Sequence, residues 1–260
     1  MLFVWGVLRI ARPRKLRLAG TPGRPNRLHP LHVVGVLLAF LIASSAAGEL
    51  CDLAVKGIAD EAVREARKVR LQFLAGSAAS VVWAAAGLIV AGATFRRGIV
   101  RGLGLSGRRW LYDSARGVLG YLAVLPVCVG LNLAMVFLFS VLEIQPEYHP
   151  VLKHLGELSL GWRLVAIVSV VVFAPLAEEV FFRGLLQSLL RRWLRSPWAA
   201  VLIASACFAA VHPNQPQAMP SLFALAVALG YNYERTGRLW APILIHAIFN
   251  AVNLASWRAP

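Results

Sequence analysis

Two adjacent carboxylates inside a long apolar run constrain this chain more than any other feature of its sequence. Glu178 and Glu179 belong to the string P-L-A-E-E-V-F-F-R at residues 175–183, within an apolar run that extends over about residues 162–190. A carboxylate near the centre of a bilayer costs about 2.5–3.5 kcal/mol even on lenient insertion scales, so such residues face the protein interior and usually mark a site. We therefore predict a membrane helix here that carries part of a functional centre.

Helical geometry separates the two carboxylates. Glu179 and Arg183 are four residues apart and share one face of a helix, with the acid N-terminal to the base, which is the favourable order for an ion pair. Glu178 points about 100° away from Glu179 and has no cation within reach on the helix. A buried carboxylate without a partner is a candidate general base or acid. We therefore predict an ion pair between Glu179 and Arg183, which leaves Glu178 for chemistry.

Similar apolar runs make up most of the chain. Hydrophobic residues account for 58% and charged residues for 15% of the 260 residues, which excludes an ordinary soluble domain. A chain of this length has room for about seven to eight spans of about 20 residues with short loops. We therefore predict an all-α, polytopic transmembrane helical bundle. The predicted spans are residues 31–48, 74–95, 117–142, 162–190, 197–211, 218–233 and 239–257, and an eighth, partial span remains open.

The charged residues lie between these runs. Residues 1–30 are rich in Arg, Pro and Gly after a short apolar stretch, which predicts an interfacial N-terminal segment. Residues 51–71 carry acids and bases four residues apart, a spacing typical of an interfacial amphipathic helix. The formal net charge of +15 comes from clusters without an aromatic-rich polar domain around them, so it indicates membrane topology rather than nucleic-acid binding. The positive-inside rule favours a cytoplasmic N-terminus.

Two further polar motifs lie in the C-terminal apolar runs. In F-A-A-V-H, Phe208 and His212 are four residues apart, and in H-A-I-F-N, His246 and Asn250 share a helix face at the same spacing. A single histidine at a helix end is more often a satisfied interfacial residue than a catalytic one, because ionisable groups near the interface cost little. Together with the two glutamates, however, the set is far more specific than any of its members.

The motifs E-E-x-x-x-R, F-x-x-x-H and H-x-x-x-N, in this order on successive membrane helices, resemble those of the CPBP family. That family comprises the type II CAAX prenyl endopeptidases and bacterial proteins related to bacteriocin processing and immunity. The resemblance covers about residues 162–253, and every motif position is filled. It implies an intramembrane endopeptidase in which Glu178 and His212 activate a water, while His246 and Asn250 stabilise the oxyanion.

The remaining motif positions are implied to be structural. Glu179 and Arg183 would form an ion pair within the membrane, and Phe208 would pack beside the site. This division agrees with the helical geometry, which by itself leaves Glu178 as the unpaired carboxylate.

The resemblance also implies how the chain is organised and what it meets. We expect a basic segment at residues 1–30, variable membrane helices at residues 31–143 and a catalytic membrane core at residues 162–257. The expected partners are a membrane-embedded or membrane-anchored peptide substrate, membrane-associated or of prenylated type, and the lipid bilayer, with no nucleic acid. We expect a multi-pass integral protein of a bacterial cytoplasmic (inner) membrane.

Two alternatives to a metal-free enzyme remain open. Glu178, His212 and His246 could hold zinc with an open coordination position, although the chain lacks the H-E-x-x-H spacing and Arg183 competes for Glu179. We predict a reaction without a cofactor and keep zinc as the alternative. A non-proteolytic membrane scaffold or immunity protein is the second alternative, but it has no reason to retain all the motif residues. A proton-coupled transporter would show repeated halves, and the sequence contains no internal repeat.

Overall fold

The computed structural model describes residues 18, 20–21, 23–145, 158–213 and 215–256. Within these ranges the secondary structure is helical, apart from turns and one isolated β-bridge between Asn26 and Phe95. The prediction of an all-α bundle is therefore confirmed. Most of the predicted basic segment at residues 1–30 lies outside the described residues.

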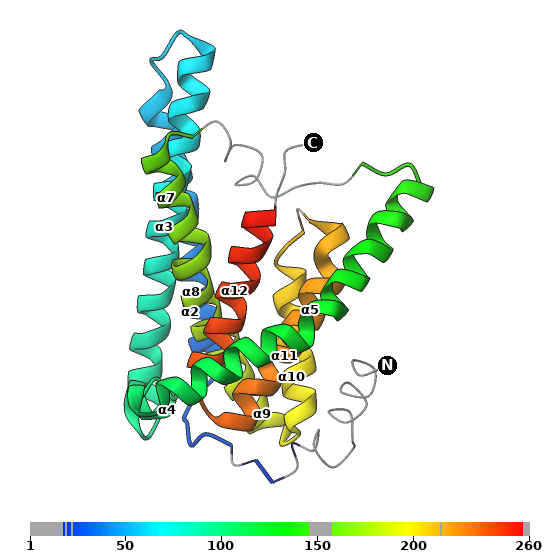
Figure 1. Ribbon diagram of the computed structural model, residues 1–260. Coiled ribbons are helices and arrows are strands. Elements are labelled where there is room, and N and C mark those ends of the chain that lie inside the picture. The colour runs from blue at the N-terminus through cyan, green and yellow to red at the C-terminus, as the bar shows by residue number, and fades with distance from the viewer. Residues whose placement is uncertain (1–17, 19, 22, 146–157, 214, 257–260) are drawn as a thin grey trace.

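The N-terminal half consists of a long helical pair and an oblique third helix (Figure 1). Its elements are α2 (Pro30–Val55), α3 (Glu61–Thr94), the short α4 (Gly98–Gly102), a 3₁₀ turn (Gly107–Arg109) and α5 (Trp110–Val141). Helices α2 and α3 pack side by side, and α5 packs against α11 and α12 of the C-terminal half.

The C-terminal half begins with one continuous helix that contains two π-helical segments. Its parts are α7 (Leu160–Val168), a π segment (Ser169–Phe173), α8 (Ala174–Glu179), a second π segment (Val180–Gln187) and α9 (Ser188–Leu194). The remaining elements are α10 (Pro197–Ala210), a 3₁₀ turn (Pro216–Ala218), α11 (Met219–Thr236) and α12 (Trp240–Ser256).

Pro175 accounts for the first π segment. Proline has no backbone N–H, and in a regular α-helix its ring clashes with the carbonyl of residue i−4. The widened turn Ser169–Phe173 directly precedes it, and the N–H of Ala174 donates to the carbonyl of Ser169, five residues earlier. The helix therefore passes the proline without ending and carries Glu178 and Glu179 in the next turn. Such π turns occur frequently at functional sites.

Four helical stretches among the described residues are long and apolar enough to cross a membrane. They are Pro30–Val55, Glu61–Thr94, Gly98–Val141 and Leu160–Leu194, and the apolar helices α10 and α12 are shorter. The chain is thus an integral membrane protein with several candidate spans. The predicted number of seven to eight is not confirmed by these four.

The predicted separate amphipathic helix at residues 51–71 is wrong. Its first residues end α2 and its last residues begin α3, and Asp60 caps α3 by accepting a hydrogen bond from the N–H of Val63. Asp52 pairs with Lys68 across the hairpin at 2.8 Å. The charges that suggested one interfacial helix therefore belong to the turn between two long helices, because acids and bases at this spacing also pair between antiparallel neighbours.

Aromatic packing and small residues hold the two halves together. The Trp83 ring on α3 lies 5.0 Å from the ring of Phe181 in the second π segment. On α5, a Cβ atom at Gly117 would come within 2.7 Å of Leu244 on α12, and one at Gly120 within 2.6 Å of Ile245. Glycines at these two positions let α5 and α12 approach closely, as small residues do between membrane helices.

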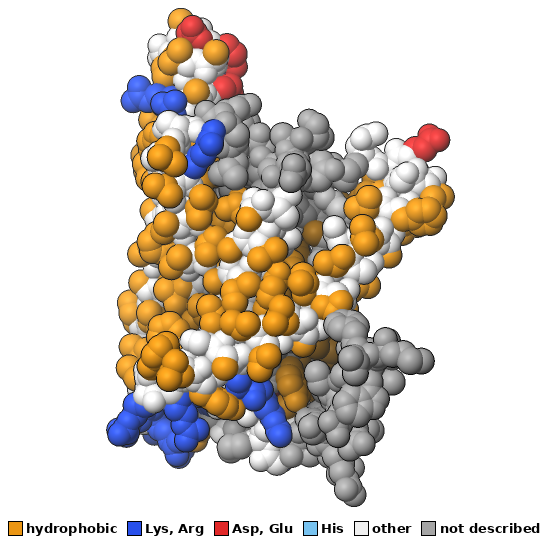
Figure 2. Space-filling model, in the orientation of Figure 1, with side chains coloured by type: hydrophobic (Ala, Val, Ile, Leu, Met, Phe, Trp, Pro, Cys, Tyr) orange, Lys and Arg blue, Asp and Glu red, His pale blue; other side chains and the backbone are white. Residues whose placement is uncertain are grey.

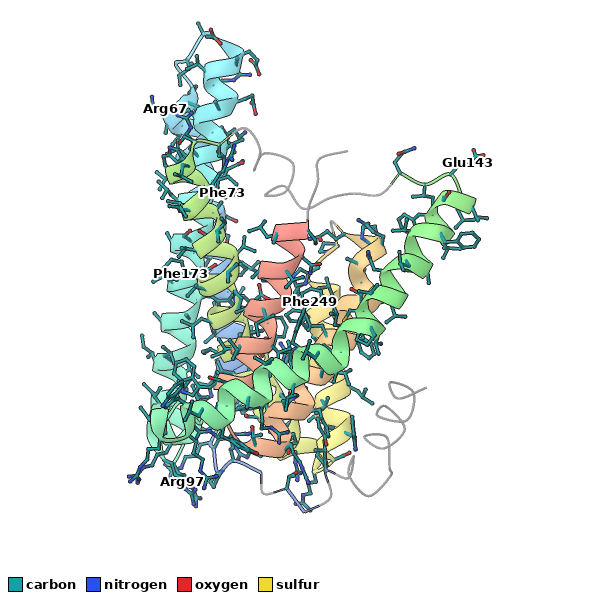
Figure 3. All side chains as sticks on the ribbon, viewed as in Figure 1. Arg67, Phe73, Arg97, Glu143, Phe173 and Phe249 are labelled. Atoms are coloured by element: carbon teal, nitrogen blue, oxygen red, sulfur yellow. The ribbon has the colours of Figure 1, made fainter. Side chains whose placement is uncertain are left out.

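Charged side chains distinguish the two ends of the bundle (Figure 2). Basic side chains gather where α3 runs into α4, near Arg97, whereas acidic and basic side chains occur together at the other end, around Arg67 (Figure 3). We call the first of these the arginine-rich end. It includes the arginines between α3 and α5 and four arginines whose hydrogen bonds join other segments at this end, namely Arg96, Arg97, Arg101, Arg108 and Arg109, and Arg24, Arg191, Arg192 and Arg238.

Candidate active site

The ion pair of the first motif is completely buried. Arg183 Nη1 donates to Glu179 Oε1 at 3.0 Å, and the two side chains are 1% and 0% exposed. Arg183 Nη2 also donates to the carbonyl of Ala226 on α11 at 3.2 Å. Removing charges from water is costly, and a partner of opposite charge with further hydrogen bonds offsets that cost. This pair therefore joins the motif helix to α11.

His246 on α12 lies between the two glutamates. Its Nδ1 is 2.9 Å from Glu179 Oε1, and its Nε2 is 3.7 Å from Glu178 Oε2. Because Glu179 is paired with Arg183 as a carboxylate, it can only accept, so the hydrogen of His246 lies on Nδ1. The ring is thereby oriented with Nε2 toward Glu178. Sequence spacing could not have predicted this contact, since Glu179 and His246 are 67 residues apart.

Glu178 is the less buried of the two carboxylates. Its side chain is 18% exposed, yet its Oε2 is buried and has no hydrogen-bond partner among the described residues. Oε2 is the atom that faces His246 Nε2. An acceptor in this position is available to a water molecule or to a substrate group.

His212 follows the end of α10, and its ring has a defined orientation. Its Nδ1 is 2.8 Å from the carbonyl oxygen of Phe208, which can only accept, so Nδ1 carries the hydrogen and Nε2 of the neutral ring is an acceptor. The Phe208 ring is fully buried and lies 5.0 Å from the His212 ring and 5.5 Å from the His246 ring. The Arg183 guanidinium carbon is 4.8 Å from the centre of the same ring. Phe208 thus packs against all three side chains.

Asn250 lies one turn beyond His246 on α12 and contacts the first π segment. Its Nδ2 donates to the carbonyl of Val170 at 2.9 Å. In the π register, the partner of that carbonyl would be the N–H of residue 175, which proline lacks, while the N–H of Ala174 is bound to Ser169. Asn250 therefore satisfies a carbonyl that Pro175 leaves without its helical partner. The second amide hydrogen remains available for another acceptor.

These residues surround the inner part of a large cavity. The cavity has a volume of about 950 Å³, and its wall includes Glu178, Phe208, His212, His246 and Asn250. Glu179 and Arg183 lie directly behind this wall. The structure thus brings all three motifs to one place, while the catalytic roles assigned to their members remain predictions.

Several polar wall residues were not identified from the sequence. Ser77 on α3 hydrogen-bonds Ser169 of the first π segment. The wall also contains Gln72, Ser80, Asn132, Gln215, Gln217 and Asn253. The available signal was a polar residue within an apolar run, as for Asn132 in the predicted span at residues 117–142. That signal does not say which face of a helix lines a cavity.

The suggested zinc ligands are not arranged as a metal site. In the part of the chain that the structure describes, no three His, Cys, Asp or Glu residues are grouped so that they could hold a metal ion. The residues therefore do not fit a preformed zinc centre, and we derive no reaction step through zinc.

The C-terminal half of the chain is similar to known proteins. Residues 160–252 match the family model described as type II CAAX prenyl endopeptidase Rce1-like. An uncharacterized 24.3 kDa protein of Escherichia coli is 28% identical over 97 residues, which cover 36% of this chain and 45% of that protein. The chain thus matches less than half of the length of this relative. No solved structure matches the chain.

Proposed function

Residues 160–252 of this chain belong to the type II CAAX prenyl endopeptidase (Rce1-like) family, and on that premise we propose that the protein is an intramembrane endopeptidase. The membership confirms the resemblance drawn from the three motifs. The proposed reaction is hydrolysis of a peptide bond in a membrane-associated substrate, without a metal cofactor.

In the proposed mechanism, Glu178 and His212 activate a water. Glu178 Oε2 has no hydrogen-bond partner among the described residues, and Nε2 of neutral His212 is an acceptor in the same cavity. Glu178 takes a proton from the water, and the resulting hydroxide attacks the carbonyl carbon of the substrate. Glu178 then gives the proton to the leaving amine as the C–N bond breaks. General base catalysis of this kind contributes about 10²–10⁴-fold.

His246 and Asn250 stabilise the oxyanion in this mechanism. Asn250 has one amide hydrogen left after its bond to Val170. In this scheme His246 donates through Nε2, in the form of the ring that carries a hydrogen on both nitrogens. Each donor aimed at a developing oxyanion is worth about 10²–10³-fold.

Glu179 and Arg183 position His246 and do not take part in bond breaking. Glu179 accepts from Arg183 and from His246 with the same oxygen, so the ion pair is also the support of the histidine ring. A positioned ring is one condition for oxyanion stabilisation, because the donor must be oriented before charge develops.

One observation carries this proposal: His246 lies between Glu178 and Glu179 at the wall of a large cavity, and Arg183 pairs with Glu179. The test compares the protein termini in membranes that contain the wild type, Glu178→Gln or the exposed control Glu49→Gln. New termini should arise with the wild type and with Glu49→Gln and should be absent with Glu178→Gln. Their persistence with Glu178→Gln would remove Glu178 from the mechanism.

Zinc-dependent hydrolysis by Glu178, His212 and His246 is the alternative reaction, and a non-proteolytic scaffold or immunity protein is the alternative class. The cavity favours an enzyme over a scaffold, because unpartnered polar groups facing a cavity are costly unless a ligand or water uses them. We also propose the bacterial cytoplasmic membrane as its location, which fits the relative in Escherichia coli and the uneven distribution of arginine.

A further inference from the structure

We propose that the peptide substrate reaches the active site from the non-cytoplasmic side of the membrane and occupies the cavity as an uncharged, largely apolar segment. This inference rests on the proposed function, because it names the substrate of that same site. It follows from where the cavity lies along the helices, from what closes its inner end, and from the charges at the two ends of the bundle.

The cavity is displaced toward one end of the bundle. On α3 the wall residues lie between Val69 and Ser80. Ser80 is 14 residues, or about 21 Å, away from the end of the helix at Thr94. On α5 the wall starts at Tyr121, about 16 Å from the first residue of that helix. On α12 it extends to the last helical residue, Ser256.

The three helices agree on the direction in which the cavity extends. Arg97 follows the end of α3, and the start of α5 lies at the same end of the bundle (Figure 3). Phe73, which belongs to the wall, lies on α3 toward the opposite end, near Arg67 (Figure 3). The cavity therefore extends away from the arginine-rich end.

Buried side chains close the cavity toward the arginine-rich end. Phe182 is 2% exposed, and Leu225 and Ile245 are fully buried, as is the ion pair of Glu179 with Arg183. The Phe182 ring packs against the Phe208 ring at 5.2 Å. A path from this side would have to break a buried ion pair, which is strongly unfavourable. The catalytic residues are therefore accessible from the other end.

The charges assign a side of the membrane to each end. Lys and Arg accumulate on the cytoplasmic side of membrane proteins, especially in short loops next to spans. Arginine prevails at the arginine-rich end, and the only acidic residues bound there among the described contacts are Asp113 and Glu234. Around Arg67, at the opposite end, acidic residues such as Glu61 and Glu65 accompany the basic ones. The arginine-rich end is thus cytoplasmic, and the cavity extends to the non-cytoplasmic side.

The chemistry of the wall limits the occupant. Glu178 and two histidines are the ionisable groups of the proposed reaction, and none of the described wall residues is Lys or Arg. The other polar wall residues are neutral, among them Gln72, Ser77, Asn132, Gln215 and Asn253. A charged substrate side chain would have no partner of opposite sign beyond the catalytic residues, whereas amides and hydroxyls can bind peptide backbone. An apolar peptide segment anchored on the non-cytoplasmic side fits these properties.

Thiol labelling tests the side of access independently of catalysis. The background lacks Cys51, Cys128 and Cys207, each replaced by Ser, and carries Glu178→Gln so that activity plays no part.

Single cysteines report on the two ends of the bundle. One is placed in the cavity wall (Asn253→Cys, with Ser256→Cys as a second position if the first does not fold), and another at the arginine-rich end (Arg97→Cys). A membrane-impermeant maleimide is added to right-side-out and to inverted vesicles.

We expect the wall cysteine to be labelled in right-side-out vesicles and protected in inverted ones, and Arg97→Cys to show the reverse. Labelling of the wall cysteine only in inverted vesicles would overturn the proposal. A second arm uses Ser256→Cys and Arg97→Cys with Glu178 intact, and the cleavage of each variant before labelling is its reference. Reagent on the wall cysteine should abolish the cleavage detected in membranes, and reagent on Arg97→Cys should leave it unchanged.

The two arms separate the failure of this inference from that of the proposed function. If cleavage never depends on Glu178, the proposed function fails while the labelling pattern still reports the side of access. If the labelling pattern is as expected but cleavage survives the modified wall cysteine, the substrate does not use this cavity, and the inference is wrong.

Discussion

The arginine-rich end and the cavity half of the bundle differ in how their carboxylates are paired. At the arginine-rich end, Arg238 donates to both carboxylate oxygens of Asp113, and Arg191 Nε lies 2.9 Å from Glu234 Oε1. In the cavity half, Glu178 Oε2 has no hydrogen-bond partner among the described residues. A carboxylate that is paired with an arginine stabilises a fold, whereas an unsatisfied acceptor beside a cavity is available for a ligand or for chemistry.

The two adjacent glutamates lie at the boundary between these regions. Glu179 belongs to the packed part, where Arg183 and His246 both donate to it. Glu178 belongs to the cavity wall. Two adjacent residues of one helix thus comprise a structural carboxylate and a proposed catalytic one, and the following variants test this division.

The largest expected effect is that of Glu178→Gln on activity. The substitution preserves shape but removes the proton acceptor, so we expect the rate to fall by about 10²–10⁴-fold. The melting temperature of the detergent-solubilised protein should stay close to the wild-type value, because Glu178 lies at the cavity wall and its contact with His246 Nε2 is as long as 3.7 Å. Cleavage rates and melting curves of Glu178→Gln, wild type and Glu49→Gln provide the measurement. A large loss of stability would place Glu178 in the packed region.

Glu179→Ala should affect stability first. It leaves the buried Arg183 without a partner and the His246 ring without its support, and breaking a buried pair typically costs about 3–5 kcal/mol. We expect a clearly lowered melting temperature together with reduced activity. If Glu179→Ala melts like the wild type and is inactive, Glu179 is catalytic and the division between the two carboxylates is wrong.

Asn250→Ala should have a smaller effect of mixed origin. Loss of an oxyanion donor predicts a rate reduced by about 10²–10³-fold. Loss of the bond to the Val170 carbonyl predicts a destabilisation of about 1–3 kcal/mol, since a buried acceptor is left unsatisfied. Asn253→Ala, one turn further on the same helix, is the control for the cavity wall. A variant that loses stability but retains its rate per folded molecule would limit Asn250 to supporting the π segment.

Removal of metal should have the smallest effect. We expect substoichiometric zinc in the purified protein and retained activity after exhaustive dialysis against a chelator, because the proposed nucleophile is activated by Glu178. Elemental analysis and an activity assay with zinc add-back measure this. One zinc per chain, with activity lost on chelation and restored by zinc, would replace the metal-free mechanism by the zinc alternative.

The motif helix contains one contact that the sequence predicted and one feature that it did not predict. The spacing of Glu179 and Arg183 predicted an ion pair because residues four apart meet on any helix, and the structure contains that contact. The two π segments on either side of α8 were not predicted. A π turn depends on the carbonyl partners that packing offers, such as Asn250, and apolar periodicity contains no such information.

The amino-acid sequence alone predicts a helical, membrane-embedded chain, identifies the residues of its three motifs, and shows which glutamate has a cation four residues away. These properties depend on apolar composition and on distances within one helix. The position of His246 between the glutamates, the part of α3 and α5 in the cavity wall, and the end toward which the cavity extends became visible only in the folded chain. Those relations join residues far apart in the chain, and they depend on how close-packed helices place their faces, which no local spacing specifies.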